Sequence, residues 1–146
     1  MKITNKKAYY LYEVLEEFNA GIVLIGSEVK SIREGNVSLV DCFAYINEGE
    51  VFIKNMKVGR YKQVHVIEKY DDNREKKALL KRKEINKITR YFQDKGITMI
   101  PLEVFFSHNK IKVKLGVCRG KKLWNKKESI KSKDLDRQTK RELSHV

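Results

Sequence analysis

The chain has 146 residues, of which 41% are hydrophobic. This length and composition suit one domain with a hydrophobic core and are too small for two stable domains. Its 32 lysines and arginines against 19 acidic residues give a net charge of +13, which indicates an anionic polymer as partner. Nucleic acid is favoured over a membrane, because no basic amphipathic helix with an aromatic apolar face suggests a membrane surface. The sequence also has no apolar stretch of spanning length and no signal peptide, so a cytoplasmic protein is expected.

The N-terminal part of the chain predicts strands. Residues 1–7 are polar and basic, so we expect them to be disordered or loosely docked. Residues 9–18 are broadly strand-like with a break near Leu15. Residues 22–25 continue as a buried strand after a bulge or bend near Gly21.

A short helix is predicted next. Ser27 is the expected N-cap of a helix over residues 28–34, and Gly35 is its C-terminal stop. Helical spacing turns Val29 and Ile32 toward the core.

The middle of the chain predicts a hairpin and a second helix. Residues 42–46 and 51–55 alternate apolar with polar side chains on both sides of a turn over 47–49, which is typical of a hairpin. A surface helix is expected over residues 83–95, with Ile85, Ile88 and Phe92 on its inner face and Gly96 at its end.

A second hairpin ends the folded part. It is expected over 97–106 and 111–117, joined by 107–110, with Pro101 at an edge or a bulge. Residues 64–67 suggest one further, irregular strand. About six short strands usually close into a small barrel, because closure removes exposed edges, although the residues alone favour a barrel over a sandwich only weakly.

No arrangement of residues suggests catalysis, a metal or a cofactor. Cys42 and Cys118 lie far apart with no further ligand at metal spacing, so buried, reduced thiols are expected. The three histidines are scattered, and no nucleophile stands beside a base. A nuclease would need clustered carboxylates for a metal, and Asp71-Asp72 lies in a lysine-rich segment.

Cations surround apolar side chains in two places. Residues 77–83 place Leu79 and Leu80 among lysines and an arginine, and the pattern fits either two core leucines beside a solvated face or an RNA-binding surface. Further on, four lysines surround Trp124, which could stack on a base or fold back on the domain.

The chain changes character near Gly120. Residues 119–146 hold ten lysines and arginines against four acidic residues and few apolar ones. We therefore predict a domain over 1–119 and a basic tail over 120–146, disordered when free and helical when bound to nucleic acid.

Ordered motifs along the chain give a family resemblance. They are Asn5-Lys6-Lys7-Ala8, Glu17-Phe18-Asn19-Ala20-Gly21-Ile22, Gly26-Ser27-Glu28-Val29-Lys30-Ser31-Ile32-Arg33-Glu34-Gly35, Lys77-Ala78-Leu79-Leu80, Lys95-Gly96, Ile100-Pro101-Leu102, Gly116-Val117-Cys118-Arg119-Gly120-Lys121-Lys122 and Lys126-Lys127-Glu128. Together they resemble small protein B (SmpB), the tmRNA-binding protein of bacterial trans-translation. The resemblance implies an OB-like closed antiparallel barrel of about six strands with two or three peripheral helices.

The resemblance also implies function and partners. It implies a non-enzymatic adaptor that binds the tRNA-like domain of tmRNA and delivers it to stalled ribosomes, while the tail probes the decoding region and the vacant mRNA channel of the small subunit. The implied tmRNA-binding residues are Asn5, Lys6, Lys7, Asn19, Ala20, Gly21, Lys77, Leu79, Leu80, Lys81 and Arg82. The implied ribosome-binding residues are Lys121, Lys122, Trp124, Asn125, Lys126, Lys127, Lys131 and Lys133.

The sequence departs from the family pattern in three places. Asn19 stands where the family usually has a glutamate, so the side chain offers one acceptor and one donor group instead of two acceptor oxygens. Asp71-Asp72 stands where the family has Asp-Pro, which leaves that loop less rigid. Residues 125–127 replace Asp-Lys-Arg and lose a carboxylate and a planar cation. The alternative function is that of a general single-strand RNA-binding OB-fold module. Nothing in the sequence demands self-association, so a monomer is expected.

Overall fold

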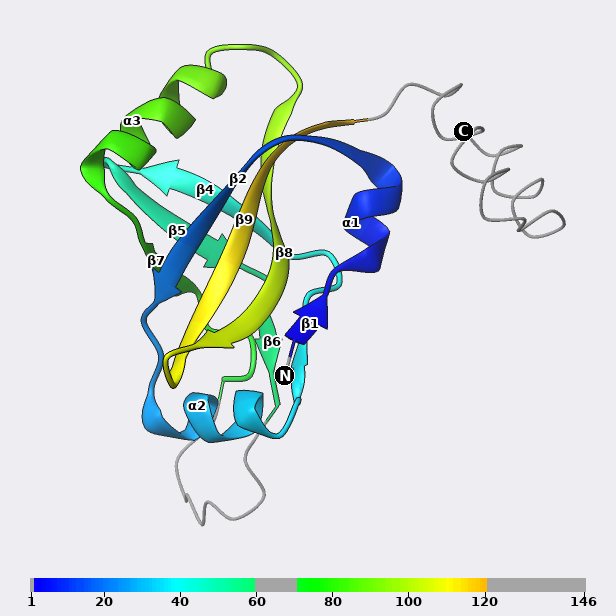
Figure 1. The fold of residues 1–146 in the computed structure, drawn as a ribbon, viewed down its shortest axis with the longest axis vertical. Coiled ribbons are helices and arrows are strands. Elements are labelled where there is room, and N and C mark those ends of the chain that lie inside the picture. The colour runs from blue at the N-terminus through cyan, green and yellow to red at the C-terminus, as the bar shows by residue number, and fades with distance from the viewer. Residues whose placement is uncertain (1, 60–70, 121–146) are drawn as a thin grey trace, which may run out of the picture.

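The computed structural model of the protein describes residues 2–59 and 71–120 (Figure 1). The expected irregular strand at 64–67 lies outside these residues. In chain order the elements are β1 (Lys2–Thr4), α1 (Lys6–Leu11), β2 (Tyr12–Ile22), α2 (Gly26–Arg33), β3 (Val37–Ser38), β4 (Phe43–Asn47), β5 (Glu50–Lys54), β6 (Lys57–Val58), β7 (Lys76–Leu79), α3 (Arg82–Tyr91), β8 (Ile97–Ser107) and β9 (Lys110–Gly120).

Six strands form a ring of antiparallel pairs. The order is β8-β4-β5-β7-β2-β9, and β9 pairs with β8 again, so each of these strands has a partner on both sides. In Figure 1, β2, β9 and β8 cross the front of the molecule, and β4 and β5 lie behind them. The predicted mainly β fold of about six strands with two or three helices is therefore confirmed, and the pairing leaves no open edge within this ring.

Both predicted hairpins are confirmed. β4 and β5 are joined by Glu48 and Gly49, and β8 and β9 are joined by His108 and Asn109. All four turn residues have positive φ angles, between 51° and 75°. Two central residues of this kind match the right-handed twist of the flanking strands, which fixes the register of each hairpin.

Two register shifts bend the long strands. In β2 the pairing with β9 shifts between Val14 and Glu16, which confirms the predicted break near Leu15. In β8 the pairing with β9 shifts between Pro101 and Glu103, so the predicted bulge at the proline is also confirmed. Proline has no N–H to donate, and the bulge accommodates that missing hydrogen bond.

Aliphatic side chains fill the inside of the ring. β5, β8 and β9 contribute Ile53, Met99 and Val113, all fully buried. From α3, Ile85 and Ile88 are buried as predicted, and Phe92 packs against the same cluster. The helix ends at Tyr91, earlier than expected, because the polar residues 93–95 offer no apolar side chain to bury and the chain turns there.

The N-terminal expectation is wrong. Residues 2–4 form β1, which pairs with β8, and residues 6–11 form α1. The predicted strand over 9–18 therefore begins only at Tyr12. The reason is long-range, because the Asn5 side chain, which caps the helix, also donates to the distant carbonyls of Leu39 and Pro101.

The expectation for residues 22–25 is also wrong. β2 ends at Ile22, and Val23 and Ile25 are 44% and 48% exposed. Helix α2 then starts at Gly26, with Ile25 rather than Ser27 as its N-cap, because the carboxylate of Glu28 accepts the Ile25 N–H at 2.9 Å.

Candidate nucleic-acid interface

The pairing of β2 with β7 brings together two predicted RNA-binding segments that are far apart in the sequence. Gly21 lies opposite Leu79, and Ile22 lies opposite Ala78. On its other edge β2 pairs with β9, where Gly21 lies opposite Lys112. Residues 19–21 and 77–80 thus share one part of the ring.

Gly21 allows this close approach. Its pairing is regular toward both neighbours, so the predicted bulge or bend at this glycine is not found. A Cβ atom placed on Gly21 would lie 3.4 Å from the Cβ of Leu79. The missing side chain therefore leaves the face of Leu79 open.

The neighbouring side chains divide between core and surface. Leu79 is 51% exposed, whereas Leu80 is half-buried and packs against the core, so the alternative of two core leucines holds only for Leu80. Ala20 is fully buried, while Asn19 on the same strand is exposed. An exposed leucine that shares its strand with Lys77 is the kind of apolar surface on which an unstacked base can rest.

A groove of about 460 Å³ runs beside Leu79. Its lining is mostly apolar, with cations on one side, and consists of Gly21, Ile22, Leu24, Val29, Leu79, Asn109, Lys110, Ile111 and Lys112. Sequence reasoning missed the tip of the β8–β9 hairpin as part of this site. The hairpin itself was predicted, but only the register of β9 against β2 carries Lys110 and Lys112 to the groove.

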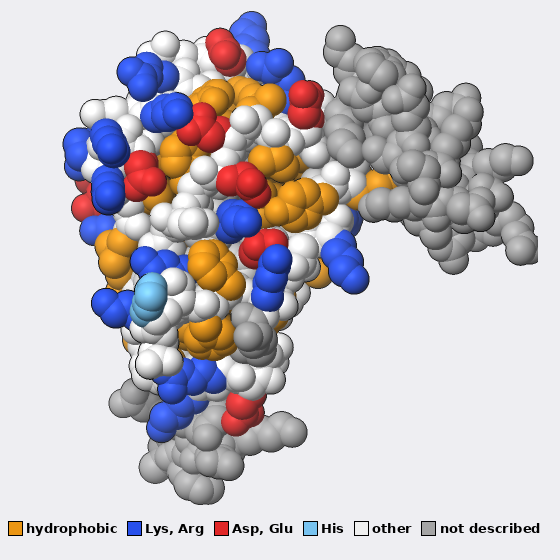
Figure 2. Space-filling view, in the orientation of Figure 1, with side chains coloured by type: hydrophobic (Ala, Val, Ile, Leu, Met, Phe, Trp, Pro, Cys, Tyr) orange, Lys and Arg blue, Asp and Glu red, His pale blue; other side chains and the backbone are white. Residues whose placement is uncertain are grey.

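Cations also cover α3, which follows β7 directly. Figure 2 shows lysine and arginine side chains gathered over this helix, with acidic side chains between them. Lys87 is paired with Glu16 at 2.6 Å, and hydrogen bonds from Lys87 and then from Tyr91 lower the pKa of Glu16. Because such exposed pairs are worth little, the surface remains cationic toward phosphate.

Charged and polar side chains near β7 are also held by the fold. Lys77 pairs with Glu50 at 3.0 Å, and the guanidinium of Arg82 donates to the carbonyl of Gly49 at 3.2 Å. The backbone N–H of Lys81 donates to Glu84 at 2.9 Å, and the Lys81 side chain is exposed. These contacts hold β7 and the start of α3 against the β4–β5 turn.

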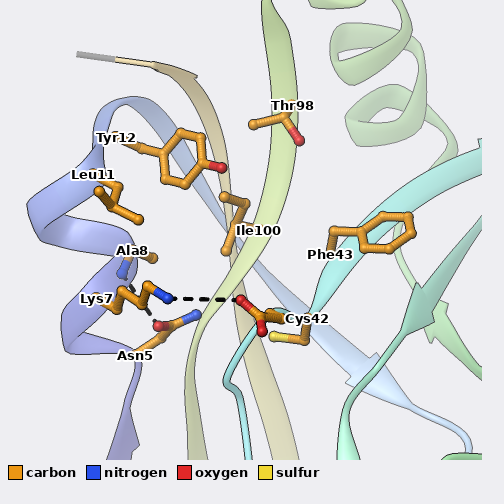
Figure 3. A pocket seen from close by; sticks show the side chains of 10 residues that line it. Asn5, Lys7, Ala8, Leu11, Tyr12, Cys42, Phe43, Thr98 and Ile100 are labelled. Atoms are coloured by element: carbon orange, nitrogen blue, oxygen red, sulfur yellow. Dashed lines mark hydrogen bonds and ion pairs between the residues drawn. The ribbon is translucent and has the colours of Figure 1, made fainter. Parts of the chain in front are cut away.

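Asn5 lies elsewhere in the ring, and its side chain is used within the protein. Its amide nitrogen donates to the carbonyls of Leu39 at 3.2 Å and Pro101 at 3.1 Å. Its oxygen accepts the N–H of Ala8 at 3.2 Å (Figure 3). The backbone N–H of Asn5 donates to Leu102 at 2.7 Å. Asn5 is buried and joins β8, α1 and the segment before β4, so its direct role is to position α1.

Lys6 and Lys7 extend from the helix that Asn5 caps. Both are exposed, and Lys7 lies 3.8 Å from the carboxylate of Asp41 across a pocket of about 300 Å³. β9 and β2 stand between β8, which holds Asn5, and β7. The structure therefore separates the predicted residues 5–7 from the predicted residues 19–21 and 77–82.

We expect neither cysteine to react with iodoacetamide at pH 8 in the folded protein. Cys42 and Cys118 are free and buried, as predicted. Burial is the main cause that raises the pKa of Cys42 from 9.0 to about 12 and that of Cys118 from 9.0 to about 11. The reactive thiolate at pH 8 thus falls roughly a thousandfold and roughly a hundredfold. Mass spectrometry should find both thiols modified only in urea; rapid labelling without urea would contradict the burial.

The predicted tail residues from Lys121 to Lys133 lie outside the described part of the chain. Within residues 2–59 and 71–120, no three histidine, cysteine, aspartate or glutamate side chains are grouped to hold a metal ion. None of the helices in those two stretches has the length and apolar character needed to cross a membrane.

Comparisons with known proteins agree on one family. A family model described as SmpB protein matches residues 2–145. A protein of Acetivibrio thermocellus named SsrA-binding protein is 48% identical over 139 residues, which cover 95% of this chain and 90% of that protein. An SsrA-binding protein of Treponema denticola is 45% identical over the same length, with the same shares covered. A solved structure described as "tmRNA-SmpB: a journey to the center of the bacterial ribosome" matches with a TM-score of 0.69 and 36% identity, covering 83% of this chain and 85% of that one.

Proposed function

The chain belongs to the SmpB protein family, as its motifs predicted, and from this premise we propose that it binds the tRNA-like domain of tmRNA, the SsrA RNA. In this proposal it delivers that RNA to stalled ribosomes for trans-translation. The names of its relatives and the ribosomal context of the similar structure support this function. The single observation that carries it is the apolar groove beside Leu79 with lysines along one side.

The groove suggests how the RNA is held. Leu79 offers an apolar face to an unstacked base, while Lys110 and Lys112 are placed to neutralise phosphates on the hairpin side. Gly21 keeps the leucine accessible, and Leu80 anchors the segment in the core. The exposed amide of Asn19 can donate to and accept from a base edge or a ribose, whereas the family's glutamate only accepts.

The remaining predicted residues take supporting positions. Lys77, Lys81 and Arg82 add positive charge beside the groove. Lys6 and Lys7 form a second cationic point on the other side of the ring, held there by Asn5. A folded RNA with two arms can reach both points, and the protein then acts as a non-catalytic, monomeric adaptor in the cytoplasm.

Replacing Leu79 with aspartate should weaken binding to SsrA RNA at least tenfold. The change puts a negative charge where a base and its phosphates are proposed to lie, and it removes the apolar face. Fluorescence anisotropy with SsrA RNA and an equal-length unrelated RNA, over a salt series, measures the effect. Affinity that depends only on charge falls with salt for both RNAs, so specificity appears as a difference that survives salt.

The matched control is Gln93→Asp. Gln93 is exposed, follows α3 and does not line the groove, and the change adds the same charge. This control should bind SsrA RNA within about threefold of the unchanged chain. Equal losses for the two variants, or no preference for SsrA RNA by the unchanged chain, would replace the adaptor with a general RNA-binding module.

We further propose that the tail acts on the ribosome. Gly120, predicted as the first tail residue, belongs to β9, so the tail begins at Lys121. The composition of residues 121–146 supports a segment that becomes helical in the vacant mRNA channel, with Lys121, Lys122, Trp124 and Asn125 at the decoding region, followed by Lys126, Lys127, Lys131 and Lys133. An empty channel would then distinguish a stalled ribosome from a translating one.

A further inference from the structure

The outward face of the β4–β5 hairpin carries three neighbouring aromatic rings. Phe43 and Tyr45 lie on β4, and Phe52 lies on β5 directly opposite Tyr45. Ring centroids are 6.3 Å apart between Phe43 and Tyr45, and 5.8 Å apart between Tyr45 and Phe52. The three rings therefore form one continuous aromatic strip across two strands.

This strip is not part of the core. Along both strands the alternate residues Ala44, Val51 and Ile53 are buried inside the ring, so the three aromatic side chains point away from it. Phe43 is 38% exposed, and Tyr45 and Phe52 are half-buried.

Lysines stand at both ends of the strip. The ammonium of Lys54 lies 5.5 Å from the centroid of the Tyr45 ring, and Lys54 is the pairing partner of Phe43. At the other end, Lys77 on β7 is the pairing partner of Phe52. Lys77 also contacts Glu50, an exposed pair that water and salt screen strongly.

We propose that this aromatic strip binds unpaired RNA bases by stacking, with Lys54 and Lys77 neutralising the adjoining phosphates. Side-by-side ring faces between cations are how proteins hold single-stranded nucleic acid without reading its sequence. Duplex RNA hides its base faces within the helix, so the strip selects unpaired segments. The net charge of +13 favours a polyanion over a second copy of this chain as the occupant. The inference does not rest on the groove at Leu79, because the three rings do not line that groove and stacking on them does not depend on the RNA sequence.

The test compares an unstructured RNA oligonucleotide of about ten nucleotides with a blunt RNA duplex of the same length, both unrelated to SsrA RNA. The full chain carries the double change Tyr45→Leu and Phe52→Leu, which keeps apolar bulk and all charges but removes two rings. We expect its affinity for the oligonucleotide to fall roughly tenfold or more and its affinity for the duplex to stay the same. The control Tyr45→Phe keeps the ring and should bind the oligonucleotide like the unchanged chain.

Cross-linking locates the contact independently of affinity. An oligonucleotide carrying thiouridine, irradiated with the unchanged chain, should cross-link to peptides that contain residues 43–54, as mapped by mass spectrometry. Unaltered oligonucleotide binding by the double variant, or equal losses for oligonucleotide and duplex, would overturn the proposal. Sedimentation provides a third readout: if the double change abolishes self-association of the chain but not RNA binding, the strip is a protein interface instead.

Discussion

Replacing Glu28 with alanine is expected to destabilise the fold by about 3–5 kcal/mol, the usual cost of removing one partner from a buried ion pair. Glu28 is fully buried in α2, and its carboxylate accepts two hydrogen bonds from the guanidinium of Arg74. The same carboxylate also accepts the Ile25 N–H at 2.9 Å and lies 3.8 Å from the ammonium of Lys76. One carboxylate thus joins α2 to the segment that leads into β7.

The lysine in this cluster makes the loss severe. Lys76 is fully buried and donates to the carbonyls of Met56 at 2.9 Å and Arg74 at 2.7 Å. Burial lowers the pKa of Lys76, and the neighbouring charge of Glu28 acts against this shift. Without Glu28 the buried ammonium would lose its main negative neighbour and keep only the weaker influence of Asp71 and Asp72.

Urea unfolding followed by circular dichroism measures the effect. Glu28→Gln keeps an acceptor for the Ile25 N–H and removes only the charge, so it separates the ion pair from the helix cap. The matched surface control is Glu50→Ala, which breaks the exposed pair with Lys77 and should cost at most about 1 kcal/mol. If Glu28→Ala costs no more than Glu50→Ala, the cluster does not stabilise the fold. Adding Lys76→Met to Glu28→Gln should recover part of the loss.

A chain that ends at Gly120 is expected to keep SsrA RNA binding and to lose tagging of stalled nascent chains completely. This follows from the proposal that residues 121–146 enter the vacant mRNA channel. The described ring is complete at Gly120, because β9 pairs with β2 up to Tyr12 opposite Gly120. The net charge falls from +13 to +8, because residues 121–146 hold nine lysines and arginines and four acidic residues. Affinity for any RNA should therefore drop modestly at low salt, while the preference for SsrA RNA stays.

Reconstituted translation on a message without a stop codon provides the measurement, with tagged product quantified on a gel. The full-length chain with Leu79→Asp is the informative comparison, since it should lose both RNA binding and tagging. Trp124→Ala in the full chain tests the single indole, and a partial loss of tagging is expected from one stacking contact. Normal tagging by the chain that ends at Gly120 would contradict the proposed role of the tail.

Local patterns in the sequence predicted much of the fold. Alternation on both sides of short turns located both hairpins, and the spacing of Ile85 and Ile88 identified the inner face of α3. These signals work because the periods of strands and helices depend only on neighbouring residues. The N-terminal segment failed for the opposite reason. Asn5 is polar, so the sequence predicts an exposed residue. It is buried because it donates hydrogen bonds to Leu39 and Pro101, which are distant in the sequence.

The candidate site was likewise predicted from the sequence only in part. Residues 19–21 and 77–82 were recognised from family motifs, but nothing local distinguishes the exposed Leu79 from the half-buried Leu80. The burial of Glu28 was also missed, because a glutamate near a helix start is ordinarily a solvated residue that favours the helix dipole.

The sequence by itself determined that this is a single, strand-rich, strongly basic chain of the SmpB family, suited to a nucleic-acid partner. The tertiary structure alone decided which side chains meet. It paired Gly21 with both Leu79 and Lys112, carried the β8–β9 hairpin tip to the groove, and turned three aromatic rings outward on β4 and β5. The physical reason is register: in a strand, a shift of one residue moves every side chain to the opposite face, and register depends on partners that are distant in the sequence.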